Sequence, residues 1–422
     1  MTSPPPAAAA VGSLAESLLR EPLPFGLRCW DGSRAGPADA KATLVLHSPL
    51  ALRRVLYAPG ELGFARSYAA GELDVEGDLL WLIEVARPAL RQAKALRPAS
   101  LARARQVAAL EGVLGGPLPP PPEEARVARW RGPLARDKRG TAHHYDMGNE
   151  FYRLVLGPSM TYSCARFVHP DDTLEAAQEA KHDLICRKLG LEPGMRLLDV
   201  GCGWGTLARH AASRYGAKVV GITLSPAQRD WALAAAEEAG LAGQVEIRLQ
   251  HFRELAGEQF DAVCSVGMYE HVGPGEAESY FETLHRALRP GGRLLNHAIS
   301  KPGGSHYGSR SFLLRYVFPN GRLRDVGATA QAMQRAGLEV RDVECLREHY
   351  GLTLRAWVAN LERHWKEAEA LVGPGRARVW RLYMTGSINS FETATIAVHQ
   401  VLGVKLAPGG RSGMPMTRAG WR

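Results

Sequence analysis

The 422-residue sequence contains no run of about 18 uncharged apolar residues, the length that a membrane-spanning helix needs. Its first residues are rich in Pro and Ala, but they lack the basic start and the long apolar stretch of a signal peptide. Only six cysteines are present and none forms a C-x-x-C pair, which argues against a zinc site and a disulfide framework. These absences predict a cytoplasmic protein with reduced thiols and no metal site.

Positive charge is in moderate excess: the sequence has 52 Lys and Arg residues and 43 Asp and Glu residues, which gives a net charge of +9. This excess suits an anionic partner, either nucleic acid or an anionic membrane surface, but solubility alone also accounts for it. Two segments carry much of the basic charge. The first is Ala/Leu-rich and is expected to form a basic amphipathic helix, and the second contains a tryptophan, as peripheral membrane contacts often do. The first holds Arg91, Lys94, Arg97, Arg103 and Arg105, and the second holds Arg126, Arg129, Trp130, Arg131, Arg136, Lys138 and Arg139.

The length of the chain fits two domains separated by a proline-rich segment. Residues 1–13 are predicted to be a disordered tail, and residues 14–98 a smaller N-terminal α+β domain. Residues 99–140 form a basic linker, in which four consecutive prolines at 119–122 predict an extended spacer without helix. Residues 141–422 alternate strand and helix patterns, which predicts an α/β domain with a doubly wound, mostly parallel sheet.

Local signals place the main elements. Residues 42–47 alternate as a strand does, and Asp78 is expected to cap an apolar helix. Ser225 followed by Pro226 predicts the start of another helix. In the second domain, strands are predicted at 195–200, 218–222, 245–249, 261–266 and 292–298, and helices at 207–215, 226–239 and 276–288.

The main motif is the turn Asp199-Val200-Gly201-Cys202-Gly203-Trp204-Gly205, between a predicted strand and a predicted helix. Glycines let the backbone approach a ligand, and the following helix presents free N–H groups. A dinucleotide site would place its last glycine one residue later. This spacing, with an acidic residue two positions before the first glycine, is typical of S-adenosylmethionine-dependent methyltransferases. After the next strand, Thr223 and Gln228 stand where an acidic residue usually binds the ribose, and both can form hydrogen bonds without a charge.

Further segments point to a more specific resemblance to a known family. The resemblance covers residues 141–392 and extends more loosely to residues 71–79. With these segments the sequence resembles the cyclopropane fatty acid synthases and the related mycolic acid methyltransferases, which methylate double bonds in lipid acyl chains. The class I methyltransferase fold, which is Rossmann-like, is implied. The matching segments are 144–152, 160–165, 198–205, 221–228, 267–273, 297–299, 316–321 and 349–350.

The resemblance implies two sets of site residues. One set would bind S-adenosylmethionine, with the methionine end near the glycine turn and Ser163, the ribose near Thr223, and the adenine near Gln250. The second set would hold a bicarbonate ion in the active site, in part through the backbone of Ile299. The cofactor set is Tyr145, Tyr162, Ser163, Asp199, Gly201, Gly203, Thr223, Gln228 and Gln250, and the catalytic set is Cys164, Glu270, His297, Ile299 and Tyr350.

The implied chemistry explains such a site. An isolated alkene that attacks the sulfonium methyl becomes a carbocation, which requires an apolar pocket without water. A base then removes a proton, and a small anion held by neutral hydrogen-bonding groups is able to do this. Loss of one proton gives a cyclopropane. Loss of another gives a methylene branch, which a flavin- or NADPH-dependent reductase partner would convert to a methyl branch.

Two positions depart from the family pattern. His251 stands where Asp is common, next to the expected adenine site, and Arg324-Asp325 replaces a common Pro-Ser. Read singly, Cys164 and His297 are more typical of buried structural residues, and Glu270 of a helix start. Their joint placement at strand ends favours a site.

Two other classes of function stay open at this stage. A nucleic-acid methyltransferase usually carries an Asn/Asp-Pro-Pro-aromatic motif, which Ser265-Val266-Gly267-Met268-Tyr269 does not match. A non-catalytic lipid-binding protein would not need the glycine turn and the catalytic set, which are present. The N-terminal domain is expected to dock on the anionic inner face of the membrane or to mediate homo-oligomer assembly, because the enzyme must reach acyl chains in a bilayer.

Overall fold

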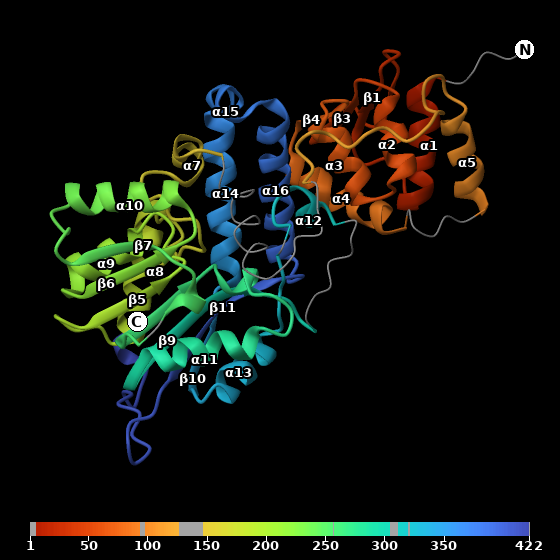
Figure 1. The fold of residues 1–422 in the computed structure, drawn as a ribbon. Helices are drawn as coiled ribbons and strands as arrows, with labels where there is room; N and C mark the ends of the chain where they lie inside the picture. Colours follow the sequence, from red (N-terminus) through yellow and green to blue (C-terminus); the bar gives the residue numbers. More distant parts are fainter. Residues whose placement is uncertain are drawn as a thin grey trace, which may run out of the picture. The chain divides into compact units, whose positions relative to one another are not determined.

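The computed structural model describes residues 6–92, 98–125, 147–255, 257–303, 311–319 and 321–421, and the chain divides into two compact units (Figure 1). Unit 1 contains the described residues within Met1–Val127, Gly308–Pro319 and Trp365–Asn389. Unit 2 contains those within Ala128–Tyr307, Asn320–His364 and Ser390–Arg422.

Unit 1 is built on a four-stranded mixed sheet in the order β2-β1-β3-β4, in which β1 is parallel to β3 and the other pairs are antiparallel. The predicted strand at 42–47 is β3. Asp78 caps helix α4 as predicted, since its carboxylate accepts a hydrogen bond from the Trp81 N–H (3.0 Å). The elements are α1 Ala7–Leu19, β1 Gly26–Arg28, β2 Arg34–Ala35, β3 Ala42–Leu46, α2 Leu50–Tyr57, α3 Glu61–Ala69, β4 Leu73–Gly77, α4 Leu79–Gln92, α5 Pro98–Ala108, α12 Phe312–Tyr316, α15 Trp365–Val372 and α16 Pro374–Glu392, whose end belongs to unit 2.

The predicted disordered tail over residues 1–13 is wrong from Ala7 onward, where α1 begins. The N–H groups of Ala7 and Ala8 donate to the Asp31 carboxylate and the Ser33 hydroxyl, each at 2.9 Å. These bonds satisfy two of the open donors at the helix start. An alanine-rich segment has high helix propensity, so the preceding prolines only mark where the helix begins.

The N-terminal unit is also not the contiguous 14–98 segment that the sequence predicts. Glu124, just after the proline run, is buried and accepts hydrogen bonds from Arg66 (2.7 Å) and from Arg315 (3.4 Å). The N–H of Ala125 donates to the carbonyl of Arg315 at 2.6 Å. A late segment of the chain therefore packs into unit 1, which no local pattern reveals.

The basic segments are described only in part. Residues 119–122 contain no helix, as predicted, and α5 occupies the start of the predicted linker. Of the first basic segment, Arg91 lies in α4, and Arg103 and Arg105 lie in α5, which begins at Pro98. Lys94 and Arg97 lie outside the described residues. The second basic segment, residues 126–139, lies outside the described residues. None of the helices in the described ranges is long and apolar enough to cross a bilayer.

Unit 2 contains the predicted doubly wound sheet, with seven strands in the order β10-β11-β9-β8-β5-β6-β7. β11 is antiparallel to both of its neighbours, and the other pairs are parallel. The strands and helices predicted between 195 and 298 are confirmed, with ends shifted by a few residues. The elements are α7 Asn149–Leu156, α8 Leu174–Leu189, β5 Arg196–Val200, α9 Thr206–Tyr215, β6 Lys218–Thr223, α10 Pro226–Glu238, β7 Val245–Leu249, η1 Phe252–Glu254, β8 Phe260–Val266, η2 Tyr269–His271, α11 Ala277–Ala287, β9 Leu288–Ser300, α13 Val326–Arg335, β10 Glu339–Cys345, α14 Arg347–Arg363, β11 Ala397–Val404 and η3 Ala419–Trp421.

Helices cover both faces of this sheet (Figure 1). Successive residues of a strand point to opposite faces, so Leu197 of β5 packs with α8, α9 and α10, whereas Leu198 packs with α11 and α13. Central strands that are buried on both faces have nearly continuous apolar sequences, and these apolar runs predict the parallel sheet. Ser225 caps α10 as predicted, by accepting from the Gln228 N–H.

The helical α1 leads to a matched stability test. Ala8 is fully buried in α1, whereas its neighbour Ala9 is exposed. Ala8→Asp should destabilise unit 1 by about 2 kcal/mol or more, because it buries a carboxylate without a partner. Ala9→Asp should change the stability by less than about 0.5 kcal/mol. Urea unfolding followed by circular dichroism measures both, and equal small effects would mean that α1 does not pack in solution.

Candidate active site

The glycine turn lies where β5 ends and α9 begins. Gly201, Gly203 and Gly205 all have positive φ angles (79°, 54° and 73°), a conformation that favours glycine. The N–H groups of Gly201 and Cys202 donate to the carbonyl of Ile222 on β6, at 2.9 and 3.0 Å. The turn is thus fixed to the neighbouring strand while its backbone stays open to a ligand.

A cleft of about 1100 Å³, including the solvent at its mouth, opens at this edge of the sheet. Every residue of the expected cofactor set that the structure describes lines it, and only Tyr145 lies outside the described residues. Cys202 also lines it, although the sequence indicated only a small filler. The lining includes Tyr162, Ser163, Lys181, His182, Asp199, Gly201, Cys202, Gly203, Trp204, Thr223, Gln228, Gln250, His251, Phe252, Met268 and His271.

Helix α8 holds the segment that contains Tyr162 and Ser163. The Gln178 amide donates to the carbonyl of Ser163, and the Lys181 ammonium donates to its hydroxyl, both at 2.9 Å. The Tyr162 ring packs against the rings of Tyr152 and Trp357, with centroid distances of 5.8 and 5.3 Å. Two hydrogen bonds and this packing fix the position of Ser163 in the cleft.

The expected ribose residues contact each other at the end of β6. The Thr223 hydroxyl donates to the Gln228 side-chain oxygen at 2.8 Å, and it accepts from the Ser225 N–H at 3.2 Å. Because the Gln228 oxygen accepts, its amide NH₂ is the group that can donate to a ribose hydroxyl. Thr223 therefore orients Gln228.

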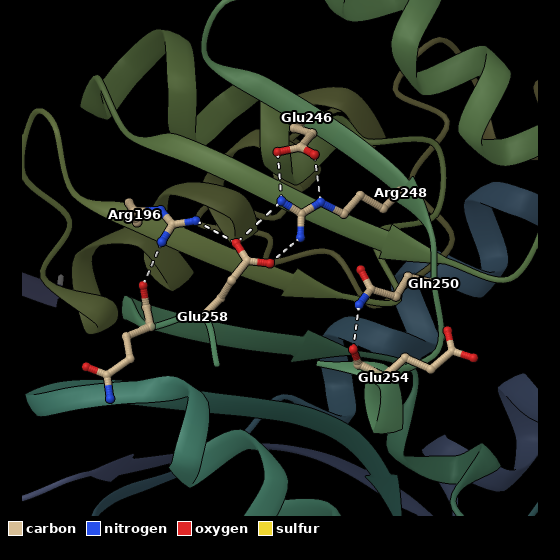
Figure 2. Close-up of polar contacts among 7 residues, drawn as sticks. Arg196, Glu246, Arg248, Gln250, Glu254 and Glu258 are labelled. Atoms are coloured by element: carbon tan, nitrogen blue, oxygen red, sulfur yellow. Dashed lines mark hydrogen bonds and ion pairs between the residues drawn. The ribbon is translucent and has the colours of Figure 1, made fainter. Parts of the chain in front are cut away.

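The loop after the edge strand β7 carries the expected adenine residue. The Gln250 amide donates to the carbonyl of Glu254 at 2.9 Å. Figure 2 shows the neighbouring ion pairs, in which Arg248 bridges Glu246 and Glu258, and Arg196 also reaches Glu258 (2.9 Å). These pairs are partly exposed, so each contributes about 0–1 kcal/mol to stability. Their main effect is to tie the end of the loop to β5 and β7.

His251, the departure in this loop, acts as a helix cap. Its Nδ1 accepts from the Arg253 N–H (3.1 Å), and the Glu254 carboxylate accepts from the His251 N–H (3.1 Å). This is a capping box, in which Asp would accept the same backbone hydrogen. Since Nδ1 accepts, the proton of the neutral ring is on Nε2. The substitution thus keeps the loop geometry.

The expected catalytic residues gather at the carboxyl end of β9. The Glu270 carboxyl accepts from the Ile299 N–H at 2.7 Å, and its other oxygen has no hydrogen-bond partner among the described residues. Burial raises the pKa of Glu270 to about 7. Glu270 lies between Met268 and His271, which line the cofactor cleft.

His297 stands two residues before Ile299 on β9, on the same face of the sheet. Its Nδ1 lies 3.3 Å from the Gln400 amide nitrogen on β11. Nδ1 therefore accepts and the ring proton is on Nε2, an atom that is buried and without a hydrogen-bond partner in the described part of the chain. Burial lowers the pKa of His297 to about 3, so the ring is neutral at physiological pH.

Cys164 and Tyr350 meet at one carbonyl group. The Cys164 thiol lies 3.2 Å from the carbonyl oxygen of Ala165 and 3.6 Å from that of Leu346. The Tyr350 backbone N–H donates to the Leu346 oxygen at 3.2 Å in the first turn of α14. The Leu346 N–H donates to Val398 of β11, which is paired with Ile299. Burial raises the pKa of the Cys164 thiol, which stays protonated. Backbone hydrogen bonds thus link the segment that carries Cys164 and Tyr350 to β11, and β11 pairs with β9, which carries His297 and Ile299.

Arg324, the second departure from the family pattern, is tied to the turn that carries Glu270. Its guanidinium donates to the carbonyls of Tyr269 (3.1 Å), Val272 (2.7 Å) and Gly273 (2.8 Å) and lies 4.5 Å from the centroid of the Tyr269 ring. A fork of fixed donors suits this set of carbonyls. Arg324 therefore positions the Glu270 turn.

Sequence reasoning missed Lys181, which lines the cleft although it is almost fully buried. A signal for it was present: Lys181 lies on α8 at helical spacing from Ala177, Leu184 and Ile185, which are core residues. A lysine on the apolar face of a helix indicates a buried charge with a role.

Comparisons with known proteins agree with this geometry. Residues 134–401 match the family model described as mycolic acid cyclopropane synthetase. A probable fatty acid methyltransferase of Mycobacterium tuberculosis is 42% identical over 418 residues, covering 94% of this chain and 95% of that protein. A tuberculostearic acid methyltransferase of the same organism is 34% identical over 414 residues, covering 94% and 92%.

The solved structure of a mycolic acid cyclopropane synthase complexed with SAH and CTAB superposes with a TM-score of 0.60 at 33% identity. The match covers 63% of this chain and 97% of that one. The family model spans more than half of the chain, and it includes the glycine turn and the catalytic set. The chain belongs to the mycolic acid cyclopropane synthetase family, and it is an S-adenosylmethionine-dependent methyltransferase that modifies fatty acids.

Proposed function

We propose that the protein transfers the methyl group of S-adenosylmethionine to the cis double bond of an unsaturated acyl chain in membrane phospholipid, giving a cyclopropane fatty acid. The observation that carries this proposal is the position of the buried set around β9 next to the cofactor cleft. Glu270 belongs to the turn that lines the cleft, and its carboxyl bonds to Ile299. A carbocation formed beside the cleft would meet neutral groups rather than water.

A bound bicarbonate ion fits this second set. The unpartnered oxygen of protonated Glu270 and the Nε2–H of His297 are donors of the kind that a small anion binds. Cys164 and Tyr350, which contact the same Leu346 carbonyl, are proposed to complete this set. When bound, bicarbonate supplies the base for the proton lost after methyl transfer. The residues of this chain hold it and exclude water.

The electron balance of the reaction is simple. The alkene π electrons form the new C–C bond to the methyl carbon while the C–S bond breaks, and S-adenosylhomocysteine leaves. The resulting cation loses one proton to the base, and the electrons of that C–H bond close the ring. The same cation gives a methylene branch if the proton leaves in another direction. The similarity to a tuberculostearic acid methyltransferase favours this as the second candidate, with a separate reductase that adds hydride and proton.

The product is the first test. The purified protein is incubated with S-adenosylmethionine and liposomes of oleoyl phospholipid, and the released fatty acids are analysed by mass spectrometry and NMR. A gain of one CH₂ with ring protons is expected. The same mass gain with vinylic methylene protons would favour the branching pathway, and no gain with intact cofactor binding would refute the lipid substrate.

Membrane contact is the second test, because the enzyme must reach acyl chains in a bilayer. We propose a peripheral contact with the anionic inner face of the membrane, made in part by the basic segments. The full chain should co-sediment with vesicles that contain anionic phospholipid, and it should dissociate as salt is raised. Equal binding to neutral vesicles at high salt would contradict an electrostatic contact.

The third test concerns Glu270. Protonated Glu270 donates to the anion, and its ionised form repels it. Because its pKa is about 7, turnover should fall as the pH rises from 7 to 8.5. Glu270→Gln keeps a donor, so it should retain part of the activity and lose this pH limb, whereas Glu270→Ala should lower kcat by about 100-fold. The exposed Glu278→Gln is the control. An unchanged pH profile in Glu270→Gln would exclude this role.

A further inference from the structure

Lys181 is a buried cation that the proposed reaction does not use. It lies on α8, is 1% exposed and lines the cofactor cleft. Within the described residues, no carboxylate lies within 4.0 Å of its ammonium, whereas Lys188 on the same helix pairs with Asp342 (3.1 Å) and Glu344. A lysine in the interior without an ion pair is costly unless it meets a negative group at some stage of function.

The hydrogen bond of Lys181 determines how Ser163 acts. The ammonium donates to the Ser163 Oγ at 2.9 Å, so the hydroxyl is an acceptor toward Lys181 and its own proton is directed elsewhere. Gln178 holds the Ser163 backbone from the same helix. Ser163 lines the cleft, and the proton of its hydroxyl is therefore available to an acceptor in the cleft.

The same cleft contains one buried acid. Asp199 is 2% exposed, and one of its carboxylate oxygens has no hydrogen-bond partner among the described residues. Burial raises the pKa of Asp199 to about 6 and lowers the pKa of Lys181 to about 7. A ligand with one negative and one positive group would stabilise the ionised forms of both Lys181 and Asp199. The α-amino acid end of S-adenosylmethionine is such a zwitterion.

We propose that Lys181 is the cationic half of a zwitterion site: it acts through the Ser163 hydroxyl on the α-carboxylate of the methionine end, while Asp199 receives the α-ammonium. This inference rests on the cofactor assignment and not on the lipid substrate. Lys181 is a positioning residue, since Ser163 stands between it and the ligand. A structural role would only hold the Ser163 segment in place, and it would affect any ligand of the cleft equally.

Two ligands separate these roles. S-Adenosylhomocysteine carries the amino acid end, whereas 5′-methylthioadenosine shares the nucleoside and the thioether without it. Calorimetry with Lys181→Met should show about 10–100-fold weaker binding of S-adenosylhomocysteine, because a charge-assisted hydrogen bond is lost. Binding of 5′-methylthioadenosine should change by less than about twofold. Lys181→Arg, which keeps the charge, should restore most of the affinity.

Lys188→Met is the matched control, because it removes another buried lysine of α8 that does not line the cleft. Both methionine variants should lose stability. Only Lys181→Met should weaken the binding of S-adenosylhomocysteine while leaving the binding of 5′-methylthioadenosine nearly unchanged. Equal loss for both ligands would mean that Lys181 only supports the loop, and no loss would exclude any role. If the wild type binds neither ligand, the cofactor assignment itself fails, which is a different result.

A pH series provides a readout that does not depend on folding of a variant. Binding of the carboxylate raises the pKa of Lys181, so affinity for S-adenosylhomocysteine should fall as the pH rises from 7 to 8.5. Affinity for 5′-methylthioadenosine should stay flat over this window, and a parallel fall would overturn the proposal. The other titratable groups that interact with Lys181 are Cys164, His182, Cys186, Asp199, His210, Cys264 and His297.

Discussion

Desolvation of polar groups at the carboxyl edge of the parallel sheet is the constraint on which the rest of unit 2 depends. Its central strands are buried on both faces, so polar groups at their ends must find partners within the protein. The Ile299 N–H donates to Glu270, and His297 accepts from Gln400 on the neighbouring strand β11. These pairs still leave buried polar atoms without a hydrogen-bond partner among the described residues: one oxygen of Glu270, Nε2 of His297 and the side-chain oxygen of Gln400. Buried polar atoms that lack a hydrogen-bond partner within the protein are therefore the atoms that can bind a ligand.

The sequence predicted what depends on local pattern. Apolar runs and the Ser225 cap placed the strands to within a few residues and α10 to within one residue, because strand burial and capping are local effects. It did not reveal α1, because prolines precede this alanine helix and because the open N–H groups at its start donate to the distant Asp31 and Ser33. Nor did it reveal the late segments of unit 1, because Glu124 and Arg315 are 191 positions apart.

The candidate site shows the same division. The glycine turn and Thr223 could be recognised because their spacing is fixed by strand-turn-helix geometry, and they line the cleft. No sequence pattern indicated what His251 and Arg324 do at the positions where the chain departs from the family. His251 keeps the capping hydrogen bond through Nδ1, and Arg324 holds the Glu270 turn through three carbonyls. At both positions the side chain differs from the one common in the family, but it still forms hydrogen bonds that fix the backbone of the loop. The loop geometry is therefore kept although the residue has changed.

The two halves of the site differ in charge for a physical reason. A cation forms on the acyl chain, and a fixed carboxylate beside it would trap it covalently, whereas a fixed ammonium would raise its energy. Neutral His297 and the protonated form of Glu270 avoid both problems on the acyl side, because burial lowers the pKa of His297 to about 3 and raises the pKa of Glu270 to about 7. On the cofactor side, burial brings the pKa of Lys181 to about 7 and that of Asp199 to about 6, and a bound zwitterion would favour the ionised form of both. Burial thus favours the uncharged forms of the site residues on both sides, and a bound zwitterion restores the charges only on the side of the methyl donor.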